Sequence, residues 1–502
     1  MTLNDFKMGK RILDEYIVRL KGTRWNRIHQ KLETNKTVRM LFWGDEIELI
    51  DDVQNEDATH KKLEVRFYNY GTGEFEEGYI NKKFKRNVGY LPLHFREDNL
   101  LQVLFLDVQQ GDASIVTLPS GKKILIDGGE GKFISRILAA LYPKTTKTKP
   151  VVFDSIIVTH GDADHFSGLF KIPETERHPT VRKRVFFKTE NIYHNGLVKS
   201  GLKGYKKAFG ASKAKGKLLY ATEIWEDSRE AMHKSNTFKK WDEAINKLLT
   251  TEGKVKRLKF GDDEEFDRHK NNGLKIKVLG PINEMLDGKD ALRYYRNERG
   301  SKSASHTVNG HSVTIRLSYK NVNFFFGGDL NIDASEHLMH HYAEQDSIVN
   351  IRSEILKVPH HGSHEYHLDF FKTISPVVSV VSSGDENVGK DYVHPRANLL
   401  GALGRASRND LPLIFCTELA AFFAYMGVVL GPMEVVKDDG KKVKLKKGFP
   451  AFNRLVYGSV RVRTDGERIL VAVESSSSIK EYYVLKIDAL GNATYMDKPS
   501  II

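Results

Sequence analysis

Short runs of apolar and β-branched residues, each followed by polar residues and glycine, recur along the middle of the chain. The run from Asp154 to Thr159 (DSIIVT) is typical of a buried strand, and Asn323 to Phe326 and Ile355 to Val358 have the same character. A further β-rich run extends from Pro376 to Ser382. We therefore predict strands here, and the polar residues that follow them lie in loops at the strands' carboxyl ends.

The loop after the first of these strands concentrates metal-ligand side chains. His160, Asp162, Asp164 and His165 follow one another in the order H-x-D-x-D-H. Alternating spacing lets the first two face one side and the last two the other, which suits two adjacent cations sharing a hydroxide. A polar turn with a capping Asp is the alternative, but crowding four such groups without a cation is unfavourable.

One loop cannot complete two coordination shells, so we expect further ligands at other strand ends. Asp329 follows an apolar strand and two glycines, His360 and His361 follow the strand ending at Val358, and His394 opens the sequence His-Pro-Arg. Each residue alone is also consistent with a turn or a structural role. Their common position, directly after a strand or beside a glycine or proline, favours a ligand role.

Six motifs together resemble the metallo-β-lactamase superfamily, in the branch typified by the soluble hydrolase domain of the DNA-uptake competence protein ComEC. In chain order they are Phe105–Ala113 (FLDVQQGDA), Ile124–Gly129 (ILIDGG), Thr159–His165 (THGDADH), Gly327–Asp329 (GGD), Leu356–Ser363 (LKVPHHGS) and His394-Pro395. The resemblance spans about residues 100–405. It implies an α/β fold, an αββα sandwich with the metal site at one edge of the sheets.

The resemblance also implies a ligand set for two divalent metal ions. It gives His160 and Asp162 to one ion and Asp164 with His165 to the other, bridged by Asp329 and completed by His394. The candidates for the third ligand of the first ion are, in order of preference, His361, His360 and His194. Many members have His where this chain has Asp162, which moves the preference from zinc toward manganese, with magnesium as a further option.

Several neighbouring residues have expected roles beside the metals. We expect Asp112 and Asp127 to orient ligand imidazoles or hold the adjacent turns, although purely structural roles are as plausible. Ser363 and Arg396 could contact a substrate phosphate. Asp164 and His361 are our candidate catalytic residues. The metals would activate a hydroxide for direct attack, without a covalent enzyme intermediate.

Charge bears on the substrate. The chain has 78 Lys and Arg against 65 Asp and Glu, a net charge of +13. Residues 182–217 contain eleven basic residues and one acidic residue, interspersed with Phe186, Phe187, Tyr193, Tyr205 and Phe209. Such a segment suits a polyanion, and a solvated loop is the alternative. We predict a phosphodiesterase or nuclease acting on DNA or RNA. The alternatives are a phosphodiesterase for a small cyclic or linear nucleotide, and a nucleic-acid-binding module with a structural or degenerate metal site.

The remaining sequence suggests additions to this domain. We expect a helical segment at residues 1–36 and a small SH3-like β-barrel at 37–95, through which protein partners could bind. The hydrolase domain at 100–405 would carry a basic insertion at 171–309, and residues 406–502 would form a β-rich extension packed on it, adding to the second sheet or lying against it.

Compartment is inferred from what the sequence does not contain. The first thirty residues have no apolar secretion signal, and the longest uncharged apolar stretch, Leu419 to Met433, is too short to span a bilayer. The single cysteine, Cys416, excludes an internal disulfide framework. We therefore expect a cytoplasmic protein without a membrane span.

Overall fold

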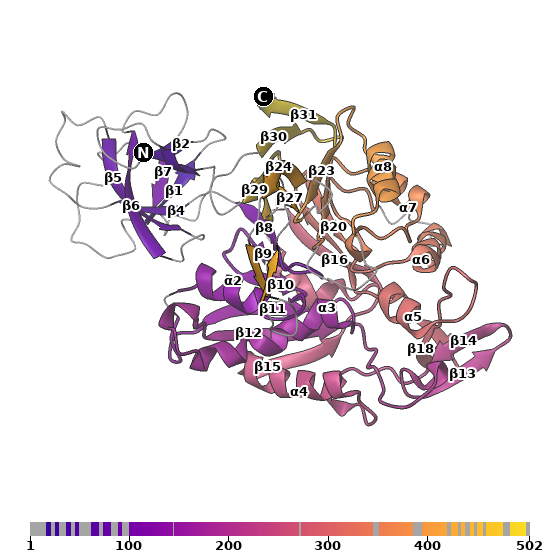
Figure 1. The fold of residues 1–502 in the computed structure, drawn as a ribbon. Coiled ribbons are helices and arrows are strands. Elements are labelled where there is room, and N and C mark those ends of the chain that lie inside the picture. Colours follow the sequence, from indigo (N-terminus) through magenta and orange to yellow (C-terminus); the bar gives the residue numbers. More distant parts are fainter. Residues whose placement is uncertain are drawn as a thin grey trace.

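A computed structural model defines the fold (Figure 1). It describes residues 100–143, 145–270, 273–344, 351–384, 394–418, 458–474 and 482–497, together with strands between residues 17 and 92 and between residues 423 and 454. All statements below concern these residues.

The strands before residue 93 form one sheet, in the order β3-β2-β6-β5-β4-β1-β7. Their bounds are β1 Ile17–Lys21, β2 Asn26–His29, β3 Thr37–Leu41, β4 Glu46–Leu49, β5 Lys62–Asn69, β6 Glu74–Asn81 and β7 Gly89–Pro92. The region where we expected a small β-barrel thus contributes β3 to β7 to a single sheet, with β3 and β7 outermost.

Part of the expected N-terminal helix is a strand instead. The spacing of Ile17 and Leu20 suggested a helix, but β1 pairs antiparallel with both β4 and β7. Two backbone ladders outweigh the helical spacing of so short a segment, because local propensity is a weak preference that tertiary pairing overrides. Strand β2 also lies within the expected helical segment of residues 1–36, and the rest of that segment lies outside the described residues.

The first main sheet has ten strands, in the order β15-β12-β11-β10-β9-β8-β28-β29-β30-β31. Their bounds are β8 Leu101–Phe105, β9 Ser114–Thr117, β10 Lys123–Ile126, β11 Val151–Ile157, β12 Phe187–His194, β15 Leu249–Arg257, β28 Ser459–Thr464, β29 Arg468–Glu474, β30 Tyr482–Ile487 and β31 Ala493–Asp497. The strands β10, β11, β12 and β15 run parallel. The C-terminal strands β28 to β31 join this sheet through the pairing of β28 with β8. An earlier part of the expected extension, Leu413–Cys416, pairs instead within the second sheet.

The second main sheet has six strands, in the order β16-β19-β20-β21-β22-β23. Their bounds are β16 Leu274–Gly280, β19 Thr314–Tyr319, β20 Val322–Phe326, β21 Ile355–Lys357, β22 Val378–Val381 and β23 Leu413–Cys416. The two sheets bury one continuous apolar core between them, to which Phe105 and Phe326 contribute stacked rings 6.0 Å apart.

Helices cover the outer faces of both sheets (Figure 1). On the first sheet they are α2 Phe133–Leu141, α3 Ala163–Phe166 and α4 Asn236–Leu248, and on the second α6 Ile332–Glu344, α7 Leu368–Ile374 and α8 Ala397–Ala406. Trp241 and Leu138 fill one outer core, and Phe370 and Leu403 the other. This is the αββα sandwich, so the expected fold class is confirmed.

The segment expected as an insertion is largely part of the sandwich. Strands β12, β15 and β16 and helix α4 all lie within residues 171–309. The insertion is limited to a separate sheet of β13 Ser212–Lys215, β14 Leu218–Ala221, β17 Glu284–Leu286 and β18 Lys289–Arg293, followed by α5 Ala304–Gly310. The sequence did not predict β12, because charged residues flank its buried positions Phe187, Ile192 and Tyr193.

Shorter elements complete the described chain. The 3₁₀ helices are η3 Ser167–Lys171, η4 Pro173–Arg177, η5 Val181–Lys183, η6 Tyr205–Lys207, η7 Ser228–Glu230, η8 Asp263–His269 and η9 His360–Gly362. Two small strand pairs are formed by β24 Phe423–Val429 with β27 Phe449–Arg454 and by β25 Met433–Val436 with β26 Lys442–Leu445. None of the described helices combines the length and the apolar character that crossing a bilayer requires.

Candidate metal centre

The loop after β11 lies where the two sheets meet, and Asp127 fixes its start. The Thr159 amide donates to Asp127 Oδ1 and the Thr159 hydroxyl to Oδ2, both at 2.7 Å. On the other side, Gly111 lies so close that an added Cβ would stand 2.0 Å from the backbone oxygen of Asp164. Its φ of +112° also favours glycine. The loop is therefore held between the ends of β10 and β8.

Three buried side chains meet at the centre of the site. The Nε2 atoms of His165 and His361 are 3.2 Å apart. Asp329 reaches both, with Oδ1 3.2 Å from His165 Nε2 and Oδ2 3.4 Å from His361 Nε2. With Asp112, these residues offer ligand-type atoms that all lie within 4.8 Å of one another. Asp329 and His361 follow the parallel neighbours β20 and β21 of the second sheet, whereas His165 follows β11 of the first sheet.

A carboxylate stands behind each of the two central imidazoles. Asp127 Oδ2 is 2.8 Å from His165 Nδ1, and Asp112 Oδ1 is 3.2 Å from His361 Nδ1. Asp112 also forms an ion pair with Lys357. This arrangement directs both Nε2 atoms toward Asp329, as carboxylates behind metal-ligating histidines do. We refer to His165, His361, Asp329, Asp112 and Asp127 as the central cluster.

His160 and Asp164 adjoin this cluster. His160 Nε2 lies 3.9 Å from Asp329 Oδ2 and has no hydrogen-bond partner among the described residues, while its Nδ1 is 3.2 Å from the Thr159 hydroxyl. Asp164 Oδ2 lies 3.3 Å from His361 Nε2. A buried imidazole nitrogen without a partner, facing a carboxylate, fits a site that holds a cation.

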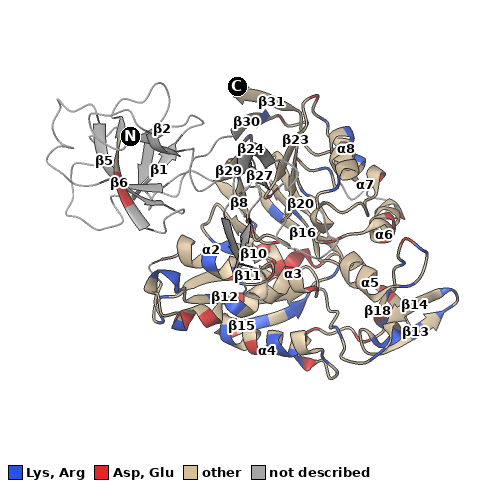
Figure 2. Cartoon of the chain, viewed as in Figure 1, with Lys and Arg blue, Asp and Glu red and all other residues tan. Residues whose placement is uncertain are grey.

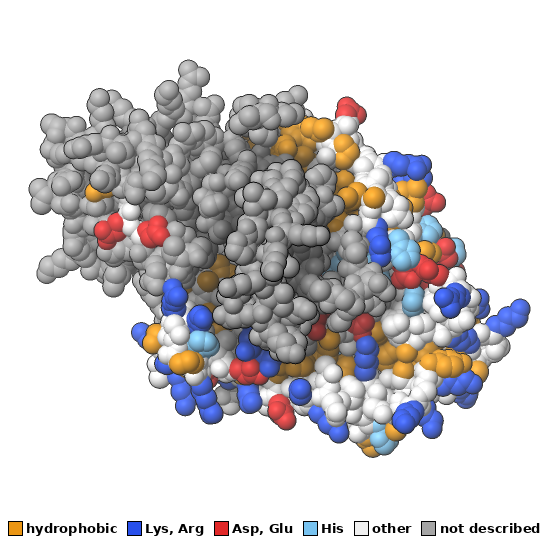
Figure 3. Space-filling view, in the orientation of Figure 1, with side chains coloured by type: hydrophobic (Ala, Val, Ile, Leu, Met, Phe, Trp, Pro, Cys, Tyr) orange, Lys and Arg blue, Asp and Glu red, His pale blue; other side chains and the backbone are white. Residues whose placement is uncertain are grey.

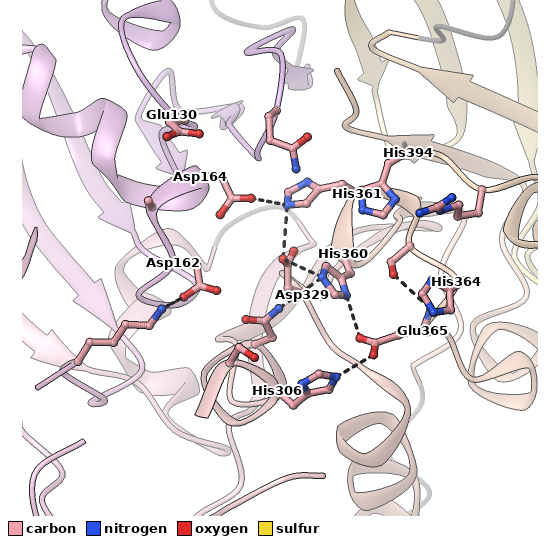
Figure 4. A pocket seen from close by; sticks show the side chains of 17 residues that line it. Glu130, Asp162, Asp164, His306, Asp329, His360, His361, His364, Glu365 and His394 are labelled. Carbon is pink, nitrogen blue, oxygen red and sulfur yellow. Dashed lines mark hydrogen bonds and ion pairs between the residues drawn. The ribbon is translucent and has the colours of Figure 1, made fainter. Parts of the chain in front are cut away.

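Asp162 and His394 lie on the walls of a pocket that opens onto the cluster. Asp162 forms an ion pair with Lys199, and the Asn309 amide, in the orientation that satisfies its neighbours, donates to it at 3.0 Å. The ring of His394 lies 6.3 Å from that of His360, centroid to centroid. Figure 4 shows Asp162 turned toward the lysine while Asp164 faces His361. Neither Asp162 nor His394 belongs to the close group of ligand atoms.

The three candidates for a third ligand occupy different places. His361 is in the central cluster, and His360 Nε2 lies 4.0 Å from Asp329 Oδ2. Both residues have positive φ, 51° and 52°, a conformation that costs a non-glycine residue about 1–3 kcal/mol and often marks a functional site. His194 is a correction to our expectation. Its Nε2 contacts the Glu226 carbonyl at 3.1 Å and its Nδ1 accepts from the Gly196 amide, so both nitrogens serve the fold.

The pocket has a volume of about 530 Å³ and mixes acidic, basic and imidazole side chains (Figure 4). Ser363 and Arg396 line it as expected. Sequence reasoning missed several lining residues, namely Gln110, Glu130, Lys199, Ser305, His306, Asn309, His364 and Glu365. Some of them lay in or beside segments that the sequence singled out: Gln110 in the first motif, Lys199 in the basic segment, and His364 and Glu365 next to the His-His-Gly-Ser motif. Ser305, His306 and Asn309 lay within the expected insertion and had no such signal.

Glu365 links two histidines at the pocket wall. Its Oε1 lies 2.7 Å from His306 Nε2, and its Oε2 lies 3.7 Å from His360 Nδ1. Glu365 therefore connects His306, in α5, to His360, whose backbone has a positive φ.

Electrostatics in the cluster are strongly coupled. Burial opposes protonation of His165, but Asp329 and Asp127 outweigh it and raise the pKa of His165 well above its usual value. Asp329 and Asp112 raise the pKa of His361 in the same way. Burial together with the charge on His165 lowers the pKa of His160 well below its ordinary value. Anionic carboxylates and neighbouring imidazoles form a donor set that suits a divalent cation.

The aromatic residues of the basic segment are mostly unavailable for binding. Phe187, Tyr193 and Phe209 are buried to 2% exposure or less in the apolar cores. Tyr205, at 46% exposure, is the exposed one among them. The expected stacking of bases along the whole segment is therefore wrong for those three rings.

Comparisons with known proteins find similarity to parts of this chain. Residues 106–189 match the family model of the metallo-beta-lactamase superfamily. A proposed metal-dependent hydrolase from Parabacteroides distasonis is similar in structure, with 13% identity and a TM-score of 0.28 over 63% of this chain and 92% of the other. A long form of RNase Z from yeast has 10% identity and a TM-score of 0.24 over 56% of this chain and 36% of its own. No curated protein matches the sequence significantly.

Proposed function

We propose that this protein, a metal-dependent hydrolase of the metallo-β-lactamase superfamily, is a phosphodiesterase that acts as a nuclease on DNA or RNA. The observation that carries the proposal is the pocket beside the central cluster, where the cations Lys199 and Arg396 line the same cavity as Asp329 and His361. A phosphodiester brings a negative charge, which these side chains would attract.

The proposed cofactor is a pair of divalent ions, zinc or manganese, with magnesium as a further option. We assign their ligands to His160, Asp164, His165, Asp329 and His361, with Asp162 and His394 reaching in from the pocket walls. When bound, such ions lower the pKa of water and stabilise negative charge that develops on a phosphoryl group.

The protein's own residues would position the reaction. Asp127 and Asp112 hold the rings of His165 and His361 by their Nδ1 atoms. Arg396 offers a planar set of donors for phosphate oxygens, with Ser363 beside it in the pocket wall. Glu365 and His306 support His360 at the other wall. The burial of the central cluster keeps bulk water away, which strengthens each electrostatic contact.

A small nucleotide is the second candidate substrate. The pocket volume of about 530 Å³ lies within the range of roughly 300–1,000 Å³ that is usual for small-ligand sites. A cyclic or linear dinucleotide would therefore have room beside the cluster. The likeness to the competence-protein branch is a prediction from the motifs.

Incubation with plasmid, single-stranded DNA, RNA and cyclic dinucleotides, each with Mn²⁺, Mg²⁺ or Zn²⁺, tests the proposal. We expect metal-dependent cleavage of nucleic acid by the wild type and none by an Asp164→Ala, His165→Ala double variant. Cleavage of cyclic dinucleotides alone would favour the second candidate. Equal product from both proteins would refute both enzyme functions and leave a nucleic-acid-binding module with a degenerate site.

A further inference from the structure

Five basic residues near α5 form no ion pair with an acidic residue in the described part of the chain. They are Lys203, Lys206, Lys207, Arg296 and Lys302, which we call the α5 patch. All but Lys302 are exposed, and Lys302 is partly exposed. Among the described residues, no carboxylate forms an ion pair with any of them, whereas nearby Lys213 pairs with Asp287 and Arg257 with Asp290. The absence of neutralising partners leaves a concentrated positive charge at this surface.

Contacts between separate segments bring the patch together. Arg296 and Lys302 face each other across an antiparallel bridge. Partial burial and the charges of Arg296 and Lys206 lower the pKa of Lys302, so both of these cations act on Lys302. Two acids have other partners: Glu298, on the same loop, pairs with His364, and Asp333, in α6, accepts from the Arg296 backbone amide.

The loop that carries Lys203, Lys206 and Lys207 is anchored. The Ser200 amide donates to the Ala208 carbonyl at 2.7 Å, which closes the loop at its base. The Tyr294 hydroxyl donates to the Tyr205 carbonyl at 3.1 Å, and the two rings meet edge to face. Tyr205 nevertheless leaves 46% of its surface exposed between the lysines. An exposed aromatic ring among fixed cations is suited to stack on an unpaired base.

The patch is continuous with the pocket. Lys199 lines the pocket four residues before Lys203, and Ser305 and His306 line it three and four residues after Lys302. Three residues span at most ~11 Å at about 3.6 Å each, so Lys302 lies within that distance of Ser305. Figure 2 marks Lys and Arg positions on the ribbon near β13 and β14, and Figure 3 shows Lys and Arg side chains on this end of the molecule.

We propose that the α5 patch binds the sugar-phosphate backbone of a single-stranded nucleic acid, a few nucleotides from the phosphodiester held in the pocket. The inference rests on the proposed function and deepens it, because the patch would bind nucleotides of the strand beyond the phosphodiester in the pocket. The chemistry is electrostatic, with phosphates on the five cations and one base on Tyr205, and is independent of sequence.

Binding without turnover tests the patch directly. Fluorescence anisotropy of a labelled 15-nucleotide single strand is measured in EDTA, from 50 to 200 mM salt, for the wild type, K206Q/R296Q/K302Q and the control K147Q/K275Q/K277Q. The control removes the same charge from exposed lysines outside the patch. We expect the patch variant to bind at least ~10-fold more weakly, with the salt slope reduced by about 2, at roughly 0.7 per lost phosphate contact. Equal weakening in both variants, or unchanged binding in the patch variant, would overturn the proposal. Tighter binding of the matching duplex would overturn the assignment to single strands.

Hydrolysis of a short and a long substrate distinguishes failure of the α5 patch from failure of the proposed function. Bis(p-nitrophenyl) phosphate is too short to reach the patch, so the patch variant should hydrolyse it as the wild type does while its KM for the 15-mer rises. If the wild type hydrolyses neither substrate, the proposed phosphodiesterase function is refuted. The binding experiment then still tests the proposal for the α5 patch. Equal KM for the 15-mer in patch variant and wild type would count against the patch alone.

Discussion

The central cluster and the α5 patch arrange charge in opposite ways. In the cluster, acids and imidazoles are buried and each lies within 4 Å of a group of the other kind. In the patch, cations of one sign stand at the surface without ion-pair partners among the described residues. Buried charges persist only when they are paired, whereas exposed charges keep their hydration. Loss of a cluster residue should therefore reduce the rate of hydrolysis, and loss of a patch residue should weaken the salt-sensitive binding of nucleic acid.

The largest effect should come from His361→Ala. His361 contacts Asp329, Asp164 and Asp112, so its loss removes a proposed ligand and unbalances three carboxylates. We expect kcat on a phosphodiester to fall about 10³-fold, equivalent to ~4 kcal/mol of transition-state stabilisation. The matched control is His340→Ala, an exposed histidine on α6. Steady-state kinetics that show similar kcat values for both variants would contradict the assigned role.

A smaller loss should follow Asp127→Asn. Asp127 orients His165 without belonging to the proposed ligands, and Asn tolerates the positive φ of 58° at this position. Loss of such an outer carboxylate typically reduces metal affinity or activity 10–100-fold. Titration with the metal that supports activity should show weaker binding. The thermal transition without metal should also fall, because the Asn amide group would face a donor of Thr159 or His165 in either orientation. A variant with wild-type metal affinity would show that Asp127 serves only the turn.

Asp154 is a buried acid outside the pocket, so a change there should affect the stability of the fold and not the reaction. Asp154 contacts Arg268 at 2.6 Å and His269 at 3.0 Å. Burial raises the pKa of Asp154, but His269 and Arg268 outweigh it and hold the pKa well below its usual range. A depressed pKa stabilises the folded state above the unfolded value, about 3.9, and this stabilisation is lost as the pH falls below it.

Asp154→Asn should therefore lower the free energy of unfolding by ~1–3 kcal/mol at neutral pH. Urea denaturation at pH 7 and pH 3 should show a difference between variant and wild type that shrinks at the lower pH, with kcat unchanged at pH 7. A difference of the same size at both pH values would argue against the ion pairs as its source.

The smallest effect should come from Lys199→Met, at the pocket wall. Lys199 pairs with Asp162 and is partly exposed, so its contact with a substrate phosphate is screened by water. We expect KM for phosphodiesters to rise up to ~10-fold, about 1.4 kcal/mol, while kcat stays within a factor of two or three. A large fall in kcat with unchanged KM would instead indicate that the lysine holds Asp162 in place for metal binding.

The sequence predicted the parts of the site that local pattern determines. Asp329 and His361 each follow an apolar strand, and parallel strands align such ends at one edge, so their meeting could be anticipated. The pairing of Asp162 with Lys199 joins residues far apart in the chain and has no local signal. Likewise His306 and Glu365 meet only because α5 packs beside the loop after β21. The sequence did not predict strand β12, whose flanks are charged, or strand β1, where the spacing around Ile17 is helical. In both places strand pairing outweighed the local preference.

Metal content and activity measured on one preparation test the central claim most directly. After dialysis against the metal that supports activity, elemental analysis of the wild type should give about two divalent ions per chain and rapid cleavage of a phosphodiester. Asp329→Asn should lose at least one ion and nearly all activity together. Fewer than about one ion per wild-type chain with no cleavage, or full activity in Asp329→Asn, would contradict a hydrolytic centre built on the central cluster.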